Sequence, residues 1–262
     1  MAVGLLMIAG GATAGLFGSL LGLGGGILIV PLLTLVFGLD LREAVGVSLV
    51  SVIMTSSAAA GVYLERHVAD LRLGMRLELF TAIGAIVGGS IAFLIDERLL
   101  SVVFGGLLTY VALTMARGTR DAAAEEGADA EADRHDAPAG RPRNMGVGVI
   151  GATGAGIASA LLGIGGGVIK VPLMHLVMGI PLRVATATSN LMVGITAAAS
   201  AVIYLLHGQI DPYVAGPTAI GVFLGASAGS RLSHRVDLRV LRWLFVAVLL
   251  YTAVQMLLRA LS

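Results

Sequence analysis

The sequence predicts an all-α polytopic membrane protein made of two inverted-topology repeats, each with a glycine-broken short helix and full transmembrane helices. The first observation is composition: 57% of the 262 residues are hydrophobic and 13% are charged, and the mean hydropathy is +0.94. Soluble domains carry about 25% charged residues. The second is a glycine-rich stretch that occurs twice, and the third is a reversal of charge between matched loops.

The glycine-rich stretch defines an internal duplication. L-G-L-G-G-G-I-L-I-V-P-L runs from Leu21 to Leu32 and returns as L-G-I-G-G-G-V-I-K-V-P-L from Leu162 to Leu173, 141 positions later. The same offset aligns the two halves without a gap from Ala14/Ala155 to Leu100/Leu241. Such self-similarity marks a repeated structural unit. We therefore divide the chain into a first membrane repeat (1–116), a linker (117–145) and a second membrane repeat (146–262).

Each repeat contains five apolar segments. In the first they are about Val3–Leu21, Ile27–Phe37, Leu41–Leu64, Leu73–Ile95 and Leu99–Ala116. In the second they are about Met145–Leu162, Val168–Met178, Leu182–Leu206, Tyr213–Leu232 and Val240–Leu261. Crossing a bilayer takes about 20 helical residues. The first and last three segments of each repeat are long enough, or nearly so, whereas the second can only span half the membrane.

The short second segment follows the glycines and contains a proline, Pro31 or Pro172. Each glycine costs about 1 kcal/mol in a helix relative to alanine. A break at membrane depth is tolerated only where it lines a cavity or is buried in protein. Proline suits the first turn of a helix and disrupts a helix interior. The short helix therefore begins either near the proline, or at the glycines with a kink at the proline. The sequence leaves both open.

The loops predict opposite orientations for the two repeats, since positive residues mark cytoplasmic loops. Between the third and fourth segments, the first repeat has three arginines and the second repeat has only His207. In the next loop the bias reverses, with four arginines in the second repeat against Arg98 alone. An inverted repeat needs an odd number of crossings per half, which five segments provide if the broken pair enters the membrane and returns to its starting side. The predicted arrangement is a multi-pass protein of the plasma membrane with a cytoplasmic linker and both termini outside.

Residues 117–145 hold seven of the sixteen acids and five of the seventeen bases. They contain no hydrophobic face to bury, which favours a flexible cytoplasmic linker over a partner-binding tail. The first four residues lack a basic region, so no cleaved signal peptide is expected.

The composition also excludes several kinds of chemistry. The chain has no cysteine, so disulfides, iron–sulfur centres and thiolate–zinc sites are not expected. The sequence has no basic patch, so nucleic-acid binding is not expected. The glycine runs lack the G-K-[ST] of a phosphate-binding loop, and Ile27 and Val168 stand where a dinucleotide fingerprint needs glycine. The apolar segments show no metal cluster or convincing catalytic set, so we expect no catalytic residues, metal or cofactor, and no enzyme activity.

The glycine runs instead favour an anion site at the membrane midplane. Free N–H groups at the start of a short helix attract anions, and Gly24, Gly25, Gly26, Gly165, Gly166 and Gly167 would supply them from both repeats. Lys170, the only lysine in the chain, would supply a positive charge. An ionisable group at membrane depth is a functional hypothesis by default. The structural alternatives are tight helix packing for the glycine runs and a lysine that snorkels to the interface. Tight packing also suits the other closely spaced glycines, Gly84, Gly88, Gly89, Gly225 and Gly229.

Polar residues of the third segments complete the predicted site. Ser48 and Ser189 occupy equivalent positions in the two repeats, and Asn190 follows the second of them. His175 could relay protons or be a packed neutral side chain. We expect the transported anion itself to be the partner of Lys170, because no acid lies in the middle of an apolar segment and Glu78 stands near the start of the fourth. On that basis Lys170→Met would keep the fold.

These residues also carry a resemblance. The two G-x-G-G-G-x-x-x-x-P motifs, the second followed by A-T-A-T-S-N-L-M-V-G-I-T-A from Ala185 to Ala197, resemble the TauE/SafE sulfite-exporter family of membrane permeases. The resemblance covers essentially the whole chain outside the linker. It implies transport of a small sulfur-containing anion, such as sulfite or an organosulfonate, across the lipid bilayer by alternating access. An anion channel that shares the midplane site is the alternative. The anion, the direction, the coupling ion and the oligomeric state stay open.

Overall fold

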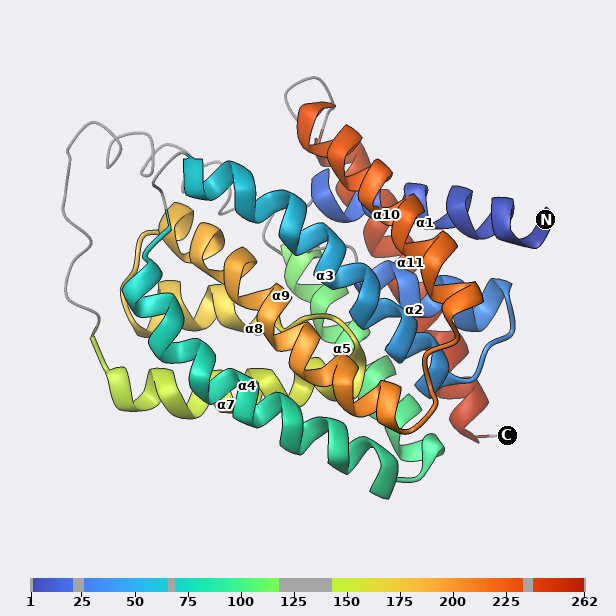
Figure 1. Ribbon diagram of the computed structural model, residues 1–262, viewed down its shortest axis with the longest axis horizontal. Coiled ribbons are helices and arrows are strands. Elements are labelled where there is room, and N and C mark those ends of the chain that lie inside the picture. Colours follow the sequence, from blue (N-terminus) through green and yellow to red (C-terminus); the bar gives the residue numbers. More distant parts are fainter. Residues whose placement is uncertain (1, 21–25, 66–68, 118–142, 233–237, 262) are drawn as a thin grey trace.

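The computed structural model describes residues 2–20, 26–65, 69–117, 143–232 and 238–261. Every regular element in these ranges is a helix (Figure 1). The first repeat contains α1 (Ala2–Leu20), α2 (Gly26–Pro31), the π-helix η1 (Leu32–Val36), α3 (Leu41–Glu65), α4 (Leu71–Leu94) and α5 (Glu97–Arg117). The second contains α7 (Met145–Leu162), α8 (Gly167–Pro172), the π-helix η2 (Leu173–Val177), α9 (Leu182–Leu206), α10 (Pro212–Leu232) and α11 (Leu238–Leu261).

Five of the described helices are long and apolar enough to cross a membrane. They are Leu41–Ala58 of α3, Leu71–Leu94 (α4), Glu97–Ala116 of α5, Met145–Leu162 (α7) and Val184–Leu206 of α9. The apolar runs of α1 and α11 are shorter, at Val3–Ser19 and Phe245–Leu258. The all-helical membrane fold is therefore confirmed, although fewer helices meet this standard than the sequence led us to expect.

Both short segments begin at the glycines, which decides between the two predicted starting points. α2 starts at Gly26 and α8 at Gly167, five residues before Pro31 and Pro172. Since proline has no N–H to donate to the preceding turn, the helix continues past it with a wider, π-type turn. In the second repeat, the Met178 N–H donates to the Leu173 carbonyl, five residues earlier, at 3.2 Å. Each short segment therefore remains helical for eleven residues.

Equivalent helices of the two repeats pack reciprocally. α1 packs against α10, and its counterpart α7 packs against α4, the counterpart of α10 (Figure 1). Likewise α3 contacts α10 while α9 contacts α4, and the equivalent pairs α3 with α9 and α5 with α11 are also in contact. Each repeat thus packs its first helix against the fourth helix of the other repeat, so the halves form one interlocked body.

Glycines allow the closest of these crossings. A side chain at Gly84 or Gly88 on α4 would collide with the α7 backbone at Thr153 or Ile157. A side chain at Gly225 or Gly229 on α10 would likewise meet the α1 backbone. Small residues let helix backbones approach in this way within membranes. The packing interpretation of these glycines is therefore confirmed, while Gly89 instead faces the Ile203 side chain.

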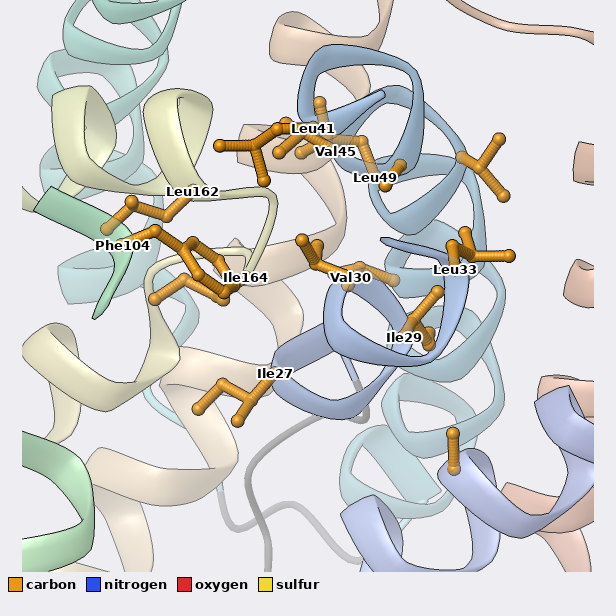
Figure 2. Packing of buried hydrophobic residues seen from close by; sticks show 14 of the residues in the cluster. Ile27, Ile29, Val30, Leu33, Leu41, Val45, Leu49, Phe104, Leu162 and Ile164 are labelled. Carbon is orange, nitrogen blue, oxygen red and sulfur yellow. The ribbon is translucent and has the colours of Figure 1, made fainter. Parts of the chain in front are cut away.

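The largest hydrophobic cluster encloses the first broken helix. Ile29, Val30 and Leu33 are inaccessible to solvent, and they belong to the same buried cluster as Ile164 of the second repeat (Figure 2). Contacts of this kind bury the short helix in protein rather than lipid, as a broken backbone requires.

The chain ends lie on one side of the view. α1 begins and α11 ends at the right of Figure 1, whereas α7 begins at the left. Most of the predicted linker and the site candidates Gly24 and Gly25 lie outside the described residues. At the edges of the linker, Arg117 still belongs to α5 and Met145 already belongs to α7.

Candidate functional site: a buried lysine beside a glycine loop

A glycine loop joins α7 to α8. Gly163, Gly165 and Gly166 have φ angles of +68°, +74° and +75°, a left-handed conformation that glycine adopts without steric cost. The Gly163 N–H closes α7 by donating to the Ser159 carbonyl at 2.8 Å, and Gly166 is the N-cap of α8. The loop residues are buried or half-buried. This is the local structure that the G-x-G-G-G pattern encodes.

The start of α8 leaves backbone donors unused. The N–H groups of Ile169 and Lys170 donate to the Gly166 carbonyl at 3.2 and 3.0 Å. For the N–H groups of Gly165, Gly166, Gly167 and Val168, the described part of the chain provides no hydrogen-bond acceptor. The first N–H groups of a helix lack intrahelical partners and attract negative charge.

The Lys170 side chain turns back along α8 toward this loop. Its Cε lies 3.5 Å from the position that a Cβ on Gly166 would occupy, and the residue is 1% exposed. Side chains on helices lean toward the N-terminus in this way. The single lysine of the chain therefore lies inside the protein, which contradicts the snorkelling alternative.

Lys170 forms a buried triad with Glu78 of α4 and Thr196 of α9. Its Nζ lies 3.3 Å from Glu78 Oε2 and donates to Thr196 Oγ1 at 2.6 Å. Thr196 Oγ1 in turn donates to Glu78 Oε1 at 2.7 Å. Glu78 is 5% exposed and Thr196 is inaccessible. The triad thus joins helices of both repeats through charge-assisted hydrogen bonds.

This ion pair corrects the expectation that no acid could reach Lys170. Glu78 lies seven residues beyond the start of α4 at Leu71, which is about 10 Å along the helix axis. Because α4 packs against both α7 and α9, the carboxylate points into the protein at the level of the α8 lysine. The prediction that Lys170→Met would keep the fold assumed that no acid contacts Lys170. That assumption was wrong, since the change would leave Glu78 without its counter-ion.

Ser48 has a structural role in this conformation. Its hydroxyl lies 2.7 Å from the Gly163 carbonyl and 3.2 Å from the Gly26 carbonyl. It therefore ties the start of the first broken helix to the glycine loop of the second repeat. Gly26 is buried between the Val52 side chain and the backbone of Gly163 and Ile164, so the two glycine segments do come together.

Two further hydroxyls near the loop are buried without a partner. Ser189 Oγ lies 3.7 Å from where a Cβ on Gly167 would be, and the Cβ of Ser159 lies close to Gly166. Neither hydroxyl has a hydrogen-bond partner within the described ranges. Unpartnered buried polar atoms are uncommon in native proteins and call for an explanation. A bound polar ligand that pairs with these hydroxyls would be such an explanation.

Asn190 is less closely connected to the triad. Its backbone carbonyl accepts a hydrogen bond from Ser56 of α3, and its side chain is half-buried. His175 Nδ1 lies 2.9 Å from the Ile180 carbonyl, a local contact of η2. Thr188, another polar residue of α9, accepts a hydrogen bond from the Asp70 N–H.

The internal repeat contains a sequence signal that links Glu78 and Thr196 to Lys170. Shifting the triad by the repeat offset leads to Ile29 for Lys170, Ala219 for Glu78 and Thr55 for Thr196. Both charged residues are replaced by apolar ones in the other repeat, while threonine stays. Lys170 and Glu78 are thus both charged, while their two equivalents in the repeat are both apolar. This joint gain or loss of charge indicates that Lys170 and Glu78 form an ion pair.

The triad is enclosed. A cavity of about 280 Å³ lies between α1, the first broken helix and α11. Another, of about 360 Å³, is lined by Asp40, Asp96, Glu97 and Arg98. Neither is lined by a triad residue.

Comparison with known proteins identifies the family. The profile of the family described as sulfite exporter TauE/SafE matches residues 7–256 of the chain. The chain belongs to this family.

Three TauE/SafE-type relatives carry a transporter name. A probable membrane transporter protein of Bacillus subtilis, YunE, is 25% identical over 97% of both chains. Two from strains of Xylella fastidiosa are 29% and 30% identical, each over 94% of both chains. No solved structure matches the sequence significantly. Family, relatives and apolar helices together support a multi-pass membrane transporter.

Proposed function

We propose that this TauE/SafE protein transports a small sulfur-containing anion, such as sulfite or an organosulfonate, by alternating access. The observation that carries the proposal is Lys170: a fully buried cation on a half-spanning helix, beside a glycine loop with unused N–H donors. Glu78 is the negative partner of this ammonium group when the site is empty, and the N–H donors that remain unused beside it are available to an anion.

The donors around Lys170 suit an oxyanion. An ammonium group has three N–H donors, and Glu78 and Thr196 occupy two of them. The remaining donor, the N–H groups of Gly165–Val168 and the hydroxyls of Ser159 and Ser189 are available to a ligand. Sulfite and sulfonate groups present several oxygens in different directions, which matches donors from several elements better than one flat carboxylate does.

Alternating access is supported by the reciprocal packing of equivalent helices. Transporters with inverted repeats place the substrate site at broken helices and rock one half against the other. We infer the same plan here, with Gly24–Gly26 from the first repeat, and with the linker cytoplasmic and both termini outside. Enclosure of the triad speaks against a permanently open anion channel, which would keep a continuous aqueous path.

Uptake into proteoliposomes tests the proposal. Vesicles containing the protein should take up labelled sulfite, sulfoacetate or methanesulfonate and should exchange internal for external substrate. An uncoupler should abolish accumulation while exchange continues. Uptake that simply follows the membrane voltage would indicate a channel, and no flux of any of the three anions would overturn the proposed substrate class.

A further inference from the structure

The Lys170–Glu78 pair has a consequence for energy coupling, and the argument rests on the proposed function. We propose that Glu78 is the proton-binding residue of the transporter: it takes up one proton when a monovalent anion binds Lys170, so that anion and proton move together. The carboxylate of Glu78 occupies the ammonium and the Thr196 hydroxyl with its two oxygens. It therefore holds donors that an oxyanion would use.

Charge in a buried site sets the order of events. With the site empty, Lys170 and ionised Glu78 sum to zero. An anion beside both would leave one net negative charge in the protein interior, which is costly. When Glu78 is protonated, Lys170 and the anion again sum to zero. The proton comes from the water on the side to which the site is open, and the neutral carboxyl group can still donate a hydrogen bond to Thr196 or to the anion.

The same charge balance makes the coupling strict. Only the empty site with ionised Glu78 and the loaded site with protonated Glu78 are neutral. Those two states can be enclosed at low cost, whereas anion without proton, or proton without anion, leaves an unpaired buried charge. A transporter that changes access only through enclosed states therefore carries one proton with each monovalent anion.

Glu78 is the group placed to take this proton. On α4 the other charged residues, Arg72 and Arg76, are exposed. α7, from 145 to 162, has no titratable side chain. On η2, His175 contacts the Ile180 carbonyl.

α9 contributes Tyr204, whose hydroxyl donates to the Ala160 carbonyl, and Arg183, whose side chain lies outside the described set. The equivalent of Glu78 in the other repeat is Ala219, so the repeat offers no second acid for a second proton. One acid therefore predicts one proton.

Calorimetry tests the parent protein without any substitution. Methanesulfonate is a suitable probe because it stays a monovalent anion near neutral pH. Titrations in buffers of different ionisation enthalpy should show uptake of about one proton per bound anion. Affinity should fall about tenfold for each unit of pH across the range in which Glu78 is ionised in the empty site and protonated in the loaded site. Binding without proton uptake, and independent of pH, would overturn the coupling but leave the anion site standing.

Variants then locate the proton. Glu78→Gln should bind methanesulfonate with no proton uptake and exchange it across vesicles, yet fail to accumulate it when a pH gradient is applied. Asp96→Asn, which removes an exposed acid, should behave like the parent. Gradient-driven accumulation by Glu78→Gln would place the proton elsewhere. Failure of methanesulfonate to bind the parent would count against the proposed anion site and, with it, against this inference.

Discussion

Lys170 of α8 and Glu78 of α4 form an ion pair, 3.3 Å from Nζ to Oε2, that joins the second repeat to the first across 92 positions of sequence. Both side chains are buried. Removing one partner of such a pair leaves an uncompensated charge inside the protein, whereas removing both is often neutral. The pair therefore governs the stability of this conformation and, under the proposed function, its capacity for an anion.

The first prediction concerns stability. Lys170→Met should destabilise the protein by about 3–5 kcal/mol, because it leaves Glu78 unpaired. The double variant Lys170→Met/Glu78→Gln should recover most of that loss. Thermal unfolding in detergent checks both, with Ile29→Met, the same change at the equivalent buried position, as the control. Equal stability of the single and double variants would mean that the ion pair is absent from the folded protein in detergent.

The second prediction concerns helix packing on α7. A side chain at Gly156 would collide with the Thr81 carbonyl of α4, whereas one at Gly154 would meet no atom within 4 Å. Gly156→Ala should therefore lower the unfolding temperature. Gly154→Ala should leave it unchanged or raise it, since alanine is favoured over glycine in a helix by about 1 kcal/mol. Equal effects would mean that α4 and α7 do not cross this closely.

The third prediction concerns topology. Reversed arginine bias in matched loops predicts that the linker is cytoplasmic and that both termini are outside. Reporter fusions at Ala137 and at Ser262 should therefore report opposite sides of the membrane. Both fusions reporting the same side would rule out the inverted repeat.

The fourth prediction concerns the linker. Residues 122–137 contain charged and small residues and offer no hydrophobic face. Their deletion should leave expression and anion uptake close to those of the parent. A loss of uptake at normal expression would show instead that the segment is regulatory or binds a partner.

Helix positions could be predicted well from the sequence. The segments Met145–Leu162 and Leu182–Leu206 coincide with α7 and α9. Apolar runs that end at glycines or charged residues leave little freedom in where a membrane helix stops. The packing glycines of α4 and α10 were equally readable, because small residues at a spacing of about four fit close crossings.

The partner of Lys170 could not be predicted in the same way. Position along one helix does not give the depth of a side chain relative to a second helix that enters only half of the membrane. The meeting of Glu78 and Lys170 depends on how α4, α8 and α9 pack, which involves contacts between distant parts of the chain. Ser48 shows the same limit, since its expected role in the site became a tie between Gly26 and Gly163.

The most direct test of the account is methanesulfonate binding to Lys170→Met/Glu78→Gln, a variant designed to fold without the buried charges. Affinity measured by calorimetry should be at least tenfold lower than in the parent, corresponding to a loss of about 1.4 kcal/mol or more of charge-assisted binding. Ile29→Met should bind like the parent. If the double variant is folded and binds methanesulfonate as tightly as the parent, Lys170 does not hold the anion and the proposed site is wrong.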